Sequence, residues 1–295
     1  MKLPKRVEVI EVGPRDGLQN EPGFIPTEQK IALIHALGKA GIRRMEATSF
    51  VHPVYVPQMR DAAEVLQGIG QREDVQYMVL IPNEKGYERA EANGVRAVSF
   101  VTGASDTFNQ RNVKMGREDS LSRMAAVIAR AKAAGMFIRY NIATAFWCPY
   151  EGRVDPAVVL DMAERLDRLD VDEIVLCDTI GRANPQQVHD LFGRCFGLQP
   201  HALLTAHFHD TYGTAQANII AALQAGVTRF DTSIGGLGGC PFAPGAAGNA
   251  ATEDVVFMLG EMGVETGIDL PALLSCVELI KPCASRELTG HVHKV

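Results

Sequence analysis

The sequence predicts a (β/α)8 barrel, or TIM barrel, and three observations support this fold class. Short runs rich in β-branched residues alternate with longer runs of helical periodicity, giving eight strand-then-helix units between about residues 7 and 265. Such alternation produces parallel strands with right-handed crossovers, and eight units close the sheet into a barrel. Glycine stands at the end of most predicted helices, as is common at helix C-termini. No dinucleotide-binding fingerprint follows the first strand, which disfavours the alternative, an open doubly wound sheet.

The predicted elements follow one another at fairly even spacing. Strands are expected at 7–12, 44–48, 75–81, 97–101, 137–143, 173–177, 203–208 and 229–233. The first helix begins at Thr27, the expected cap, and ends before Gly41. The other helices are expected at 58–69, 84–93, 118–134, 156–169, 185–196, 215–225 and 252–262. We therefore expect a single catalytic domain over residues 1–295, with a barrel at about 7–265 and a C-terminal helical extension at about 266–295.

Composition and charge exclude several classes of protein. The 295 residues are 46% hydrophobic and 22% charged, which is ordinary for a globular protein. A formal net charge of −6 argues against a nucleic-acid partner, since phosphate binding needs a basic face. No apolar run approaches the ~18 residues of a membrane helix, and the N-terminus shows no signal-peptide core. Six cysteines without paired spacing are typical of cytosolic thiols, so we expect a cytoplasmic protein with no membrane partner.

Polar side chains follow several predicted strands at their carboxyl ends. In a barrel these ends meet at one mouth, where active sites lie, so we expect the side chains to converge there. They are Arg15 and Asp16 after the first strand, Glu46 in the second, Asp178 after the sixth, His207 and His209 at the seventh, and Cys240 and Asn249 after the eighth. The set predicts a divalent metal site, with Asp178 as a hydrogen-bond anchor.

His207 and His209 carry most of the metal prediction. Side chains two apart in a strand share a face, so both imidazoles should point into the barrel mouth while Phe208 packs outward. The alternative is a pair of buried histidines bonded to the backbone. With oxygen ligands from Asp16 and Asn249, the set suits Mg²⁺, Mn²⁺ or Zn²⁺.

Arg15 and Cys240 are the candidates for the chemistry beside the metal. Arg15 is permanently charged and planar, which suits it to hold an oxyanion. Glu46 either neutralises Arg15 or takes a direct part. Cys240 lies in a glycine-rich loop before Asn249, where it could be a fifth metal ligand but is better placed as a proton donor on a closing loop. The other cysteines are expected to be small buried hydrophobes: Cys148, Cys177, Cys195, Cys276 and Cys283.

Seven segments of the chain match motifs of a known family. They read VEVIEVGPRDGLQNE (7–21), EATSF (46–50), VPQM (56–59), CPYEG (148–152), DTIGRANP (178–185), HFHDTYGTAQAN (207–218) and GGLGGCPFAPGAAGNAATEDVVFML (235–259). Together they resemble the 3-hydroxy-3-methylglutaryl-CoA lyase family, which belongs to the aldolase-like metal-dependent barrels. The cysteine loop is specific to this family. The Arg-Asp-Gly and His-x-His patterns are shared with isopropylmalate and citramalate synthases and with carboxyltransferase domains.

The resemblance implies a fold, a reaction and residue roles. It implies a (β/α)8 barrel that cleaves 3-hydroxy-3-methylglutaryl-CoA, an acyl-CoA, to acetyl-CoA and acetoacetate with Mg²⁺ or Mn²⁺, as in leucine degradation. The metal ligands would be Asp16, His207, His209 and Asn249. Arg15 would stabilise the enolate, Cys240 would transfer a proton and Glu46 would support the site. Either Asp16 or His207 would remove the hydroxyl proton. A homodimer is the expected oligomer.

The chain departs from the family pattern near the expected acyl pocket. A lysine is replaced at Pro22 and at Val54, a glycine is replaced by Cys177, and the fifth strand reads RYNIAT over 139–144. None of these changes touches the ligand set, so they leave the substrate open: citramalyl-CoA or another 3-hydroxy-3-alkyl acyl-CoA is an alternative. A condensing synthase acting on acetyl-CoA and a 2-oxo acid is a second alternative, although such enzymes usually carry a further regulatory domain.

Overall fold

The computed structural model describes residues 3–239 and 248–295. Eight parallel strands form a closed barrel in the order β1-β10-β9-β8-β5-β4-β3-β2, which confirms the predicted fold class. The strands are β1 (Glu8–Glu11), β2 (Arg44–Ser49), β3 (Gln76–Leu80), β4 (Ala97–Gly103), β5 (Phe137–Ala143), β8 (Glu173–Asp178), β9 (Leu203–Phe208) and β10 (Arg229–Thr232). Closure comes from β1, which pairs in parallel with β10 on one side and with β2 on the other.

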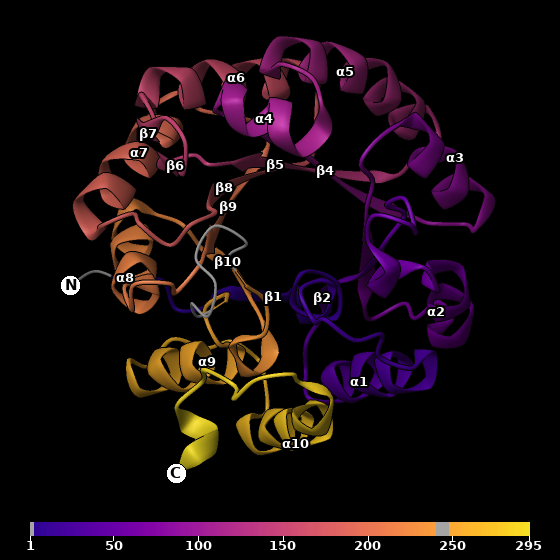
Figure 1. The fold of residues 1–295 in the computed structure, drawn as a ribbon. Coiled ribbons are helices and arrows are strands. Elements are labelled where there is room, and N and C mark those ends of the chain that lie inside the picture. Colours follow the sequence, from indigo (N-terminus) through magenta and orange to yellow (C-terminus); the bar gives the residue numbers. More distant parts are fainter. Residues whose placement is uncertain (1–2, 240–247) are drawn as a thin grey trace.

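Helices form a ring around the strands (Figure 1). They are α1 (Thr27–Lys39), α2 (Ala62–Ile69), α3 (Glu84–Ala92), α4 (Asp106–Val113), α5 (Arg117–Ala133), α6 (Pro156–Arg168), α7 (Pro185–Gly197), α8 (Ala215–Ala225), α9 (Thr252–Glu261) and α10 (Leu270–Ile280). Of the C-terminal extension, α10 packs against α1 and α9 and so completes the ring beside the closure strands. Among the described residues, none of the helices has the length and apolar character needed to cross a membrane.

Local sequence explains where several helices begin. Asn184 opens α7 with a capping box: its side chain accepts the Gln187 N–H while the Gln187 side chain accepts the Asn184 N–H. Asp155 caps α6 by accepting the Ala157 N–H. The predicted cap at Thr27 is wrong, because the Thr27 hydroxyl donates to Asp61 at 2.8 Å instead.

Most apolar side chains fill the layer between strands and helices, whereas the barrel interior contains both apolar and charged side chains. The interior holds a small apolar cluster of Ile10, Met78 and Ala97, separate from the main core. It also holds buried charged side chains that interact with one another across the barrel: Arg44, Arg139, Glu173 and Asp231. These charges form a path through the centre of the barrel.

Among the described residues, the structure contains a helix and a β-hairpin that were not predicted. Helix α4 was not expected, and neither was the two-stranded antiparallel hairpin of β6 (Trp147–Cys148) and β7 (Gly152–Arg153). The helix predicted at 58–69 is interrupted: a short 3-10 helix at Pro57–Met59 precedes α2. The hairpin and α4 both lie in segments that follow strands, on the side of the barrel where the strands end.

Candidate active site

Arg15 and Asp16 lie in a π-helical turn, η1 (Gly13–Gly17), which directly follows β1. The turn is tight and begins immediately after the strand, because the Asp16 N–H donates to the Val12 carbonyl at 2.7 Å. The Arg15 Nε donates to Glu46 Oε2 at 2.5 Å, and its Nη1 donates to Asp16 Oδ1 at 2.7 Å. Glu46, which β2 supplies, therefore neutralises Arg15 and fixes the direction of its guanidinium.

His207 and His209 meet Asp16 at the end of β9. The two imidazole centroids are 5.2 Å apart. One potential ligand atom from each of Asp16, His207 and His209 lies within 4.8 Å of the others. The predicted convergence of this aspartate with the two histidines is thus found, and all three side chains are mostly shielded from water.

Asn249 reaches the same point from the loop after β10. It forms a backbone bridge with His209, and its side-chain Nδ2 donates to Asp16 Oδ2 at 2.8 Å and to the Leu237 carbonyl at 3.2 Å. Its Oδ1 is buried without a hydrogen-bond donor. A buried oxygen that lacks a donor is costly, and a cation beside Asp16 would satisfy it. The predicted donor set of two imidazoles and two oxygens therefore fits a divalent metal.

The charges of the site favour the protonation states that metal binding requires. Burial alone would raise the pKa of Asp16, but Arg15 and the two imidazoles outweigh it and hold that pKa well below its usual value. Burial and the neighbouring His207 lower the pKa of His209 to about 4. At neutral pH the site thus offers a carboxylate and a neutral imidazole, the forms that ligate metals.

The chain is similar in sequence to a family of known enzymes. The HMGL-like family model matches residues 6–280. The mitochondrial hydroxymethylglutaryl-CoA lyase of Rattus norvegicus is 46% identical over 290 residues, which covers 98% of this chain and 89% of the relative. The chain belongs to the hydroxymethylglutaryl-CoA lyase family.

Solved lyase structures of this family share the whole fold. The crystal structure of the Bacillus subtilis HMG-CoA lyase is 43% identical, with a TM-score of 0.97 over 100% of this chain and 99% of that one. An HMG-CoA lyase from Acinetobacter baumannii, in complex with coenzyme A and 3-methylmalate, is 39% identical, with a TM-score of 0.93 over 99% of this chain and 95% of that chain.

Asp178 and the cysteines are the remaining residues for which the sequence made a prediction. Asp178 accepts the backbone N–H groups of Arg182 and Ala183 at 3.0 and 2.9 Å, so it anchors the loop after β8 as expected. Burial raises its pKa to about 6. Cys240 lies outside the described residues. Four of the other five cysteines are buried as predicted, but Cys283 is only half-buried, because it lies beyond α10 at the edge of the ring.

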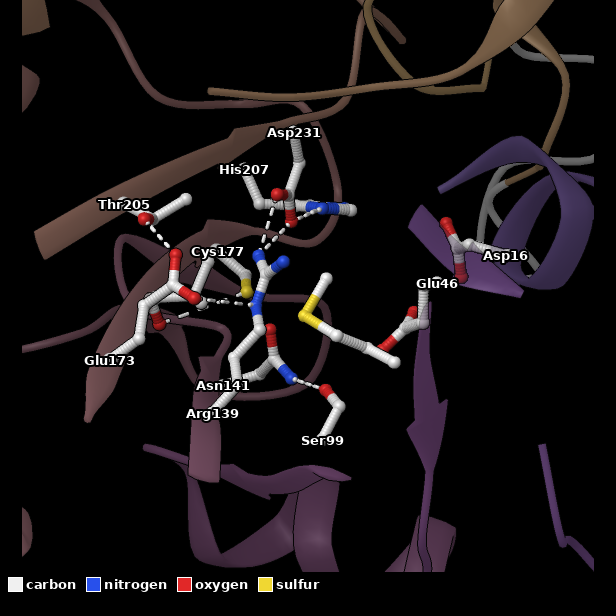
Figure 2. A network of polar contacts seen from close by, with 12 residues as sticks. Asp16, Glu46, Ser99, Arg139, Asn141, Glu173, Cys177, Thr205, His207 and Asp231 are labelled. Carbon is white, nitrogen blue, oxygen red and sulfur yellow. Dashed lines mark hydrogen bonds and ion pairs between the residues drawn. The ribbon is translucent and has the colours of Figure 1, made fainter. Parts of the chain in front are cut away.

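Arg139 and Asp231, which were not predicted as site residues, lie directly behind His207 (Figure 2). Both are almost fully buried, and they form an ion pair inside the barrel. Arg139 and Asp231 each lie within a predicted strand. A charged side chain in a buried strand needs a partner of opposite charge, so the sequence did indicate that each of them is paired. The sequence alone does not tell which strands face each other across the barrel.

Proposed function

We propose that this chain is a divalent-metal-dependent carbon–carbon lyase that cleaves 3-hydroxy-3-methylglutaryl-CoA to acetyl-CoA and acetoacetate. The observation that carries the proposal is the triad of Asp16, His207 and His209, with ligand atoms within 4.8 Å of one another and Arg15 bonded to Asp16. The triad occurs in a chain that is 44–46% identical over 98% of its length to named hydroxymethylglutaryl-CoA lyases.

The proposed reaction breaks the C2–C3 bond of the substrate. The C3 hydroxyl loses its proton, C3 becomes the ketone of acetoacetate, and C2 leaves as the enolate of acetyl-CoA. A divalent cation held by Asp16, His207, His209 and Asn249 would lower the pKa of that hydroxyl. Both candidate proton acceptors, Asp16 and His207, belong to this set.

Arg15 is proposed to stabilise the enolate oxygen. Its guanidinium is held by two carboxylates, Asp16 and Glu46, so its direction is fixed before substrate arrives. A preorganised charge aimed at a developing oxyanion typically contributes about 10²–10³ in rate. Cys240 is proposed to protonate the enolate at carbon. This role rests on the family's cysteine loop in the sequence.

The acyl-CoA substrate is proposed by analogy of whole fold and site. The Acinetobacter baumannii relative was solved with coenzyme A and 3-methylmalate, a thiol carrier and a branched hydroxy diacid, at a TM-score of 0.93 to this chain. The side chain at Val54, where the family has a lysine, is fully outside the core, and Tyr55 beside it is also exposed. Mg²⁺ or Mn²⁺, a homodimeric assembly, a cytoplasmic location and a place in leucine degradation are part of the same proposal.

A panel of substrates tests the proposal. With Mg²⁺ or Mn²⁺ present, 3-hydroxy-3-methylglutaryl-CoA should give acetoacetate and acetyl-CoA in equal amounts, and its kcat/KM should exceed that of citramalyl-CoA. Incubation with acetyl-CoA and a series of 2-oxo acids should release no free thiol. Preferred cleavage of citramalyl-CoA would reassign the substrate, and thiol release would reassign the chain to a condensing enzyme.

A further inference from the structure

A line of buried charges runs through the barrel and ends on one of the two candidate histidine ligands. Arg139 of β5 donates through Nη2 to both oxygens of Asp231 of β10, at 2.6 and 2.5 Å. The Oδ2 of Asp231 lies 3.0 Å from Nδ1 of His207 on the neighbouring strand β9. Figure 2 shows Arg139, Asp231 and His207 in contact, with Asp16 beyond the imidazole.

The ion pair fixes Asp231 in place. Arg139 is 1% and Asp231 3% exposed, so neither side chain can move into water. On its far side, the Arg139 Nε lies 4.0 Å from Glu173, which itself pairs with Arg44 and accepts the hydroxyl of Thr205. Arg139 therefore holds the Asp231 carboxylate on one side, and the Oδ2 of Asp231 can also accept a hydrogen bond from His207 on the other.

This arrangement decides which imidazole nitrogen of His207 carries the proton. A carboxylate accepts hydrogen bonds and donates none, so Nδ1 of His207 must be the protonated nitrogen. Its Nε2 then keeps the one lone pair of the ring, and once that lone pair binds the metal, Asp16 alone of the two candidate proton acceptors can take the substrate's proton. We propose that Asp231, clamped by Arg139, is a positioning residue that sets the tautomer and ring direction of His207 so that Nε2 serves as the metal-binding atom.

The two histidines are not equivalent in this respect. The Nδ1 of His209 is buried and has no hydrogen-bond partner among the described residues. A carboxylate behind a ligating imidazole raises its basicity and fixes its orientation. His207 should therefore be the better ordered and tighter of the two imidazole ligands. The inference rests on the proposed metal site but concerns residues that do not touch the metal.

Asp231→Asn tests the tautomer directly. Arg139 can donate only to an oxygen, so it would hold the carboxamide oxygen of Asn and turn the NH₂ group toward His207. That group donates to Nδ1, which moves the imidazole proton to Nε2 and removes the lone pair. We expect Mn²⁺ affinity, measured by the electron paramagnetic resonance signal of free Mn²⁺, to fall about 10- to 100-fold.

Glu173→Gln is the matched control. It removes a buried carboxylate on the opposite side of Arg139 and should cost stability, but it leaves the bond between Asp231 and His207 intact. Mn²⁺ affinity should stay within about twofold of wild type, since the contact between Asp231 and Nδ1 of His207 is unchanged. Equal losses of affinity in both variants would assign the effect to general disruption of the barrel interior and would overturn the proposal.

The tautomer can also be read in the wild-type protein without metal. The ¹⁵N shifts of His207, assigned by comparison with His207→Gln, should show a protonated Nδ1 and an unprotonated Nε2. A proton on Nε2 would overturn the proposal even if Asp231→Asn fails to fold. Wild-type protein that binds no Mn²⁺ while showing a protonated Nδ1 would instead overturn the metal site on which the proposed function depends.

Discussion

At the scale of single residues, Arg15 and Asp16 of the site each form hydrogen bonds with two other side chains. Arg15 bonds both Glu46 and Asp16, while Asp16 also accepts from Asn249. Each bond restricts the other, so the atoms that would meet a cation and an enolate are held before either arrives. Preorganisation of this kind removes the cost of ordering the site during reaction.

Glu11, at the end of β1, provides a pH-dependent contribution to stability. Its carboxyl accepts the N–H groups of Gly13 and Ile234 at 2.7 and 2.9 Å and contacts the Thr252 hydroxyl at 2.7 Å. Burial, helped by the nearby Glu253, raises its pKa from 4.5 to about 8 despite these bonds. The folded state therefore holds a proton that the unfolded state has lost, so the stabilisation is full below pH 4.5 and disappears as the pH rises toward 8.

Glu11→Gln should remove this dependence. Between pH 5 and 8, the free energy of unfolding of the wild type should fall relative to that of the variant by at most about 1.4 kcal/mol per pH unit. Urea unfolding at several pH values measures the difference. The control is Glu287→Gln, an exposed position where Lys294 lowers the pKa, so no slope is expected in this window. A constant difference between wild type and Glu11→Gln would mean that Glu11 is ionised.

Some residues of the site could be predicted from the sequence, and others could not. Arg15, Asp16, His207, His209 and Asn249 could be found because parallel strands bring their carboxyl ends together, whatever the packing. Arg139 and Asp231 could not be paired in advance, since they belong to strands that are not neighbours in the barrel. Their interaction depends on the radius and tilt of the barrel, which are properties of all eight strands together.

At the scale of elements, the C-terminal segment braces the start of the glycine-rich loop. The N–H groups of Thr289 and Gly290 donate to the Gly235 carbonyl at 3.1 and 3.3 Å, and Arg286 donates to the Gly238 carbonyl. Gly235 and Gly236 have φ values of 65° and 67°, which glycine adopts without strain. The C-terminal extension predicted at about 266–295 therefore also holds the stem of the loop that carries Cys240.

Two histidines in this segment form a matched pair for a test. His293 contacts Glu253 at 3.1 Å with its side chain only 4% exposed, whereas His291 contacts Asp254 at 2.8 Å with its side chain 78% exposed. His293→Ala leaves the buried Oε1 of Glu253 without its histidine partner and should cost about 2–3 kcal/mol in the free energy of unfolding. His291→Ala should cost less than about 1 kcal/mol. Chemical denaturation measures both, and equal effects would contradict a larger contribution from the buried His293–Glu253 contact than from the exposed His291–Asp254 contact.

The elements that sequence failed to predict are short and lack an apolar repeat. Helix α4 reads DTFNQRNV and buries only Phe108 and Asn109. Its start depends on Ser105, whose side chain accepts the Phe108 N–H at 3.1 Å, and Asn109 ties it to both backbone groups of Gly103. Tertiary hydrogen bonds rather than periodicity hold it, whereas the long amphipathic helices were found close to their observed bounds.

At the scale of the whole molecule, metal binding should be visible as stability. A ligand that binds only the folded state adds about 2.7 kcal/mol at 100 times its dissociation constant. For a chain of 295 residues, whose unfolding entropy is about 0.6 kcal/mol/K, this raises the Tm by roughly 4–5 °C. Mn²⁺ should therefore raise the Tm of the EDTA-treated protein. Asp16→Asn should lose this increase, while Glu287→Gln should keep it. An Mn²⁺-dependent increase that survives in Asp16→Asn would place the metal elsewhere.

Closure of the barrel joins residues from opposite ends of the sequence. Asn249 bonds Asp16 across 233 positions of chain, where β10 meets β1. A growing polypeptide on the ribosome can fold its early strand–helix units long before this contact exists, yet it cannot assemble the complete cradle of ligands. The proposed metal site would then be complete only once translation has passed Asn249, so loading of the cation would follow folding rather than guide its first steps.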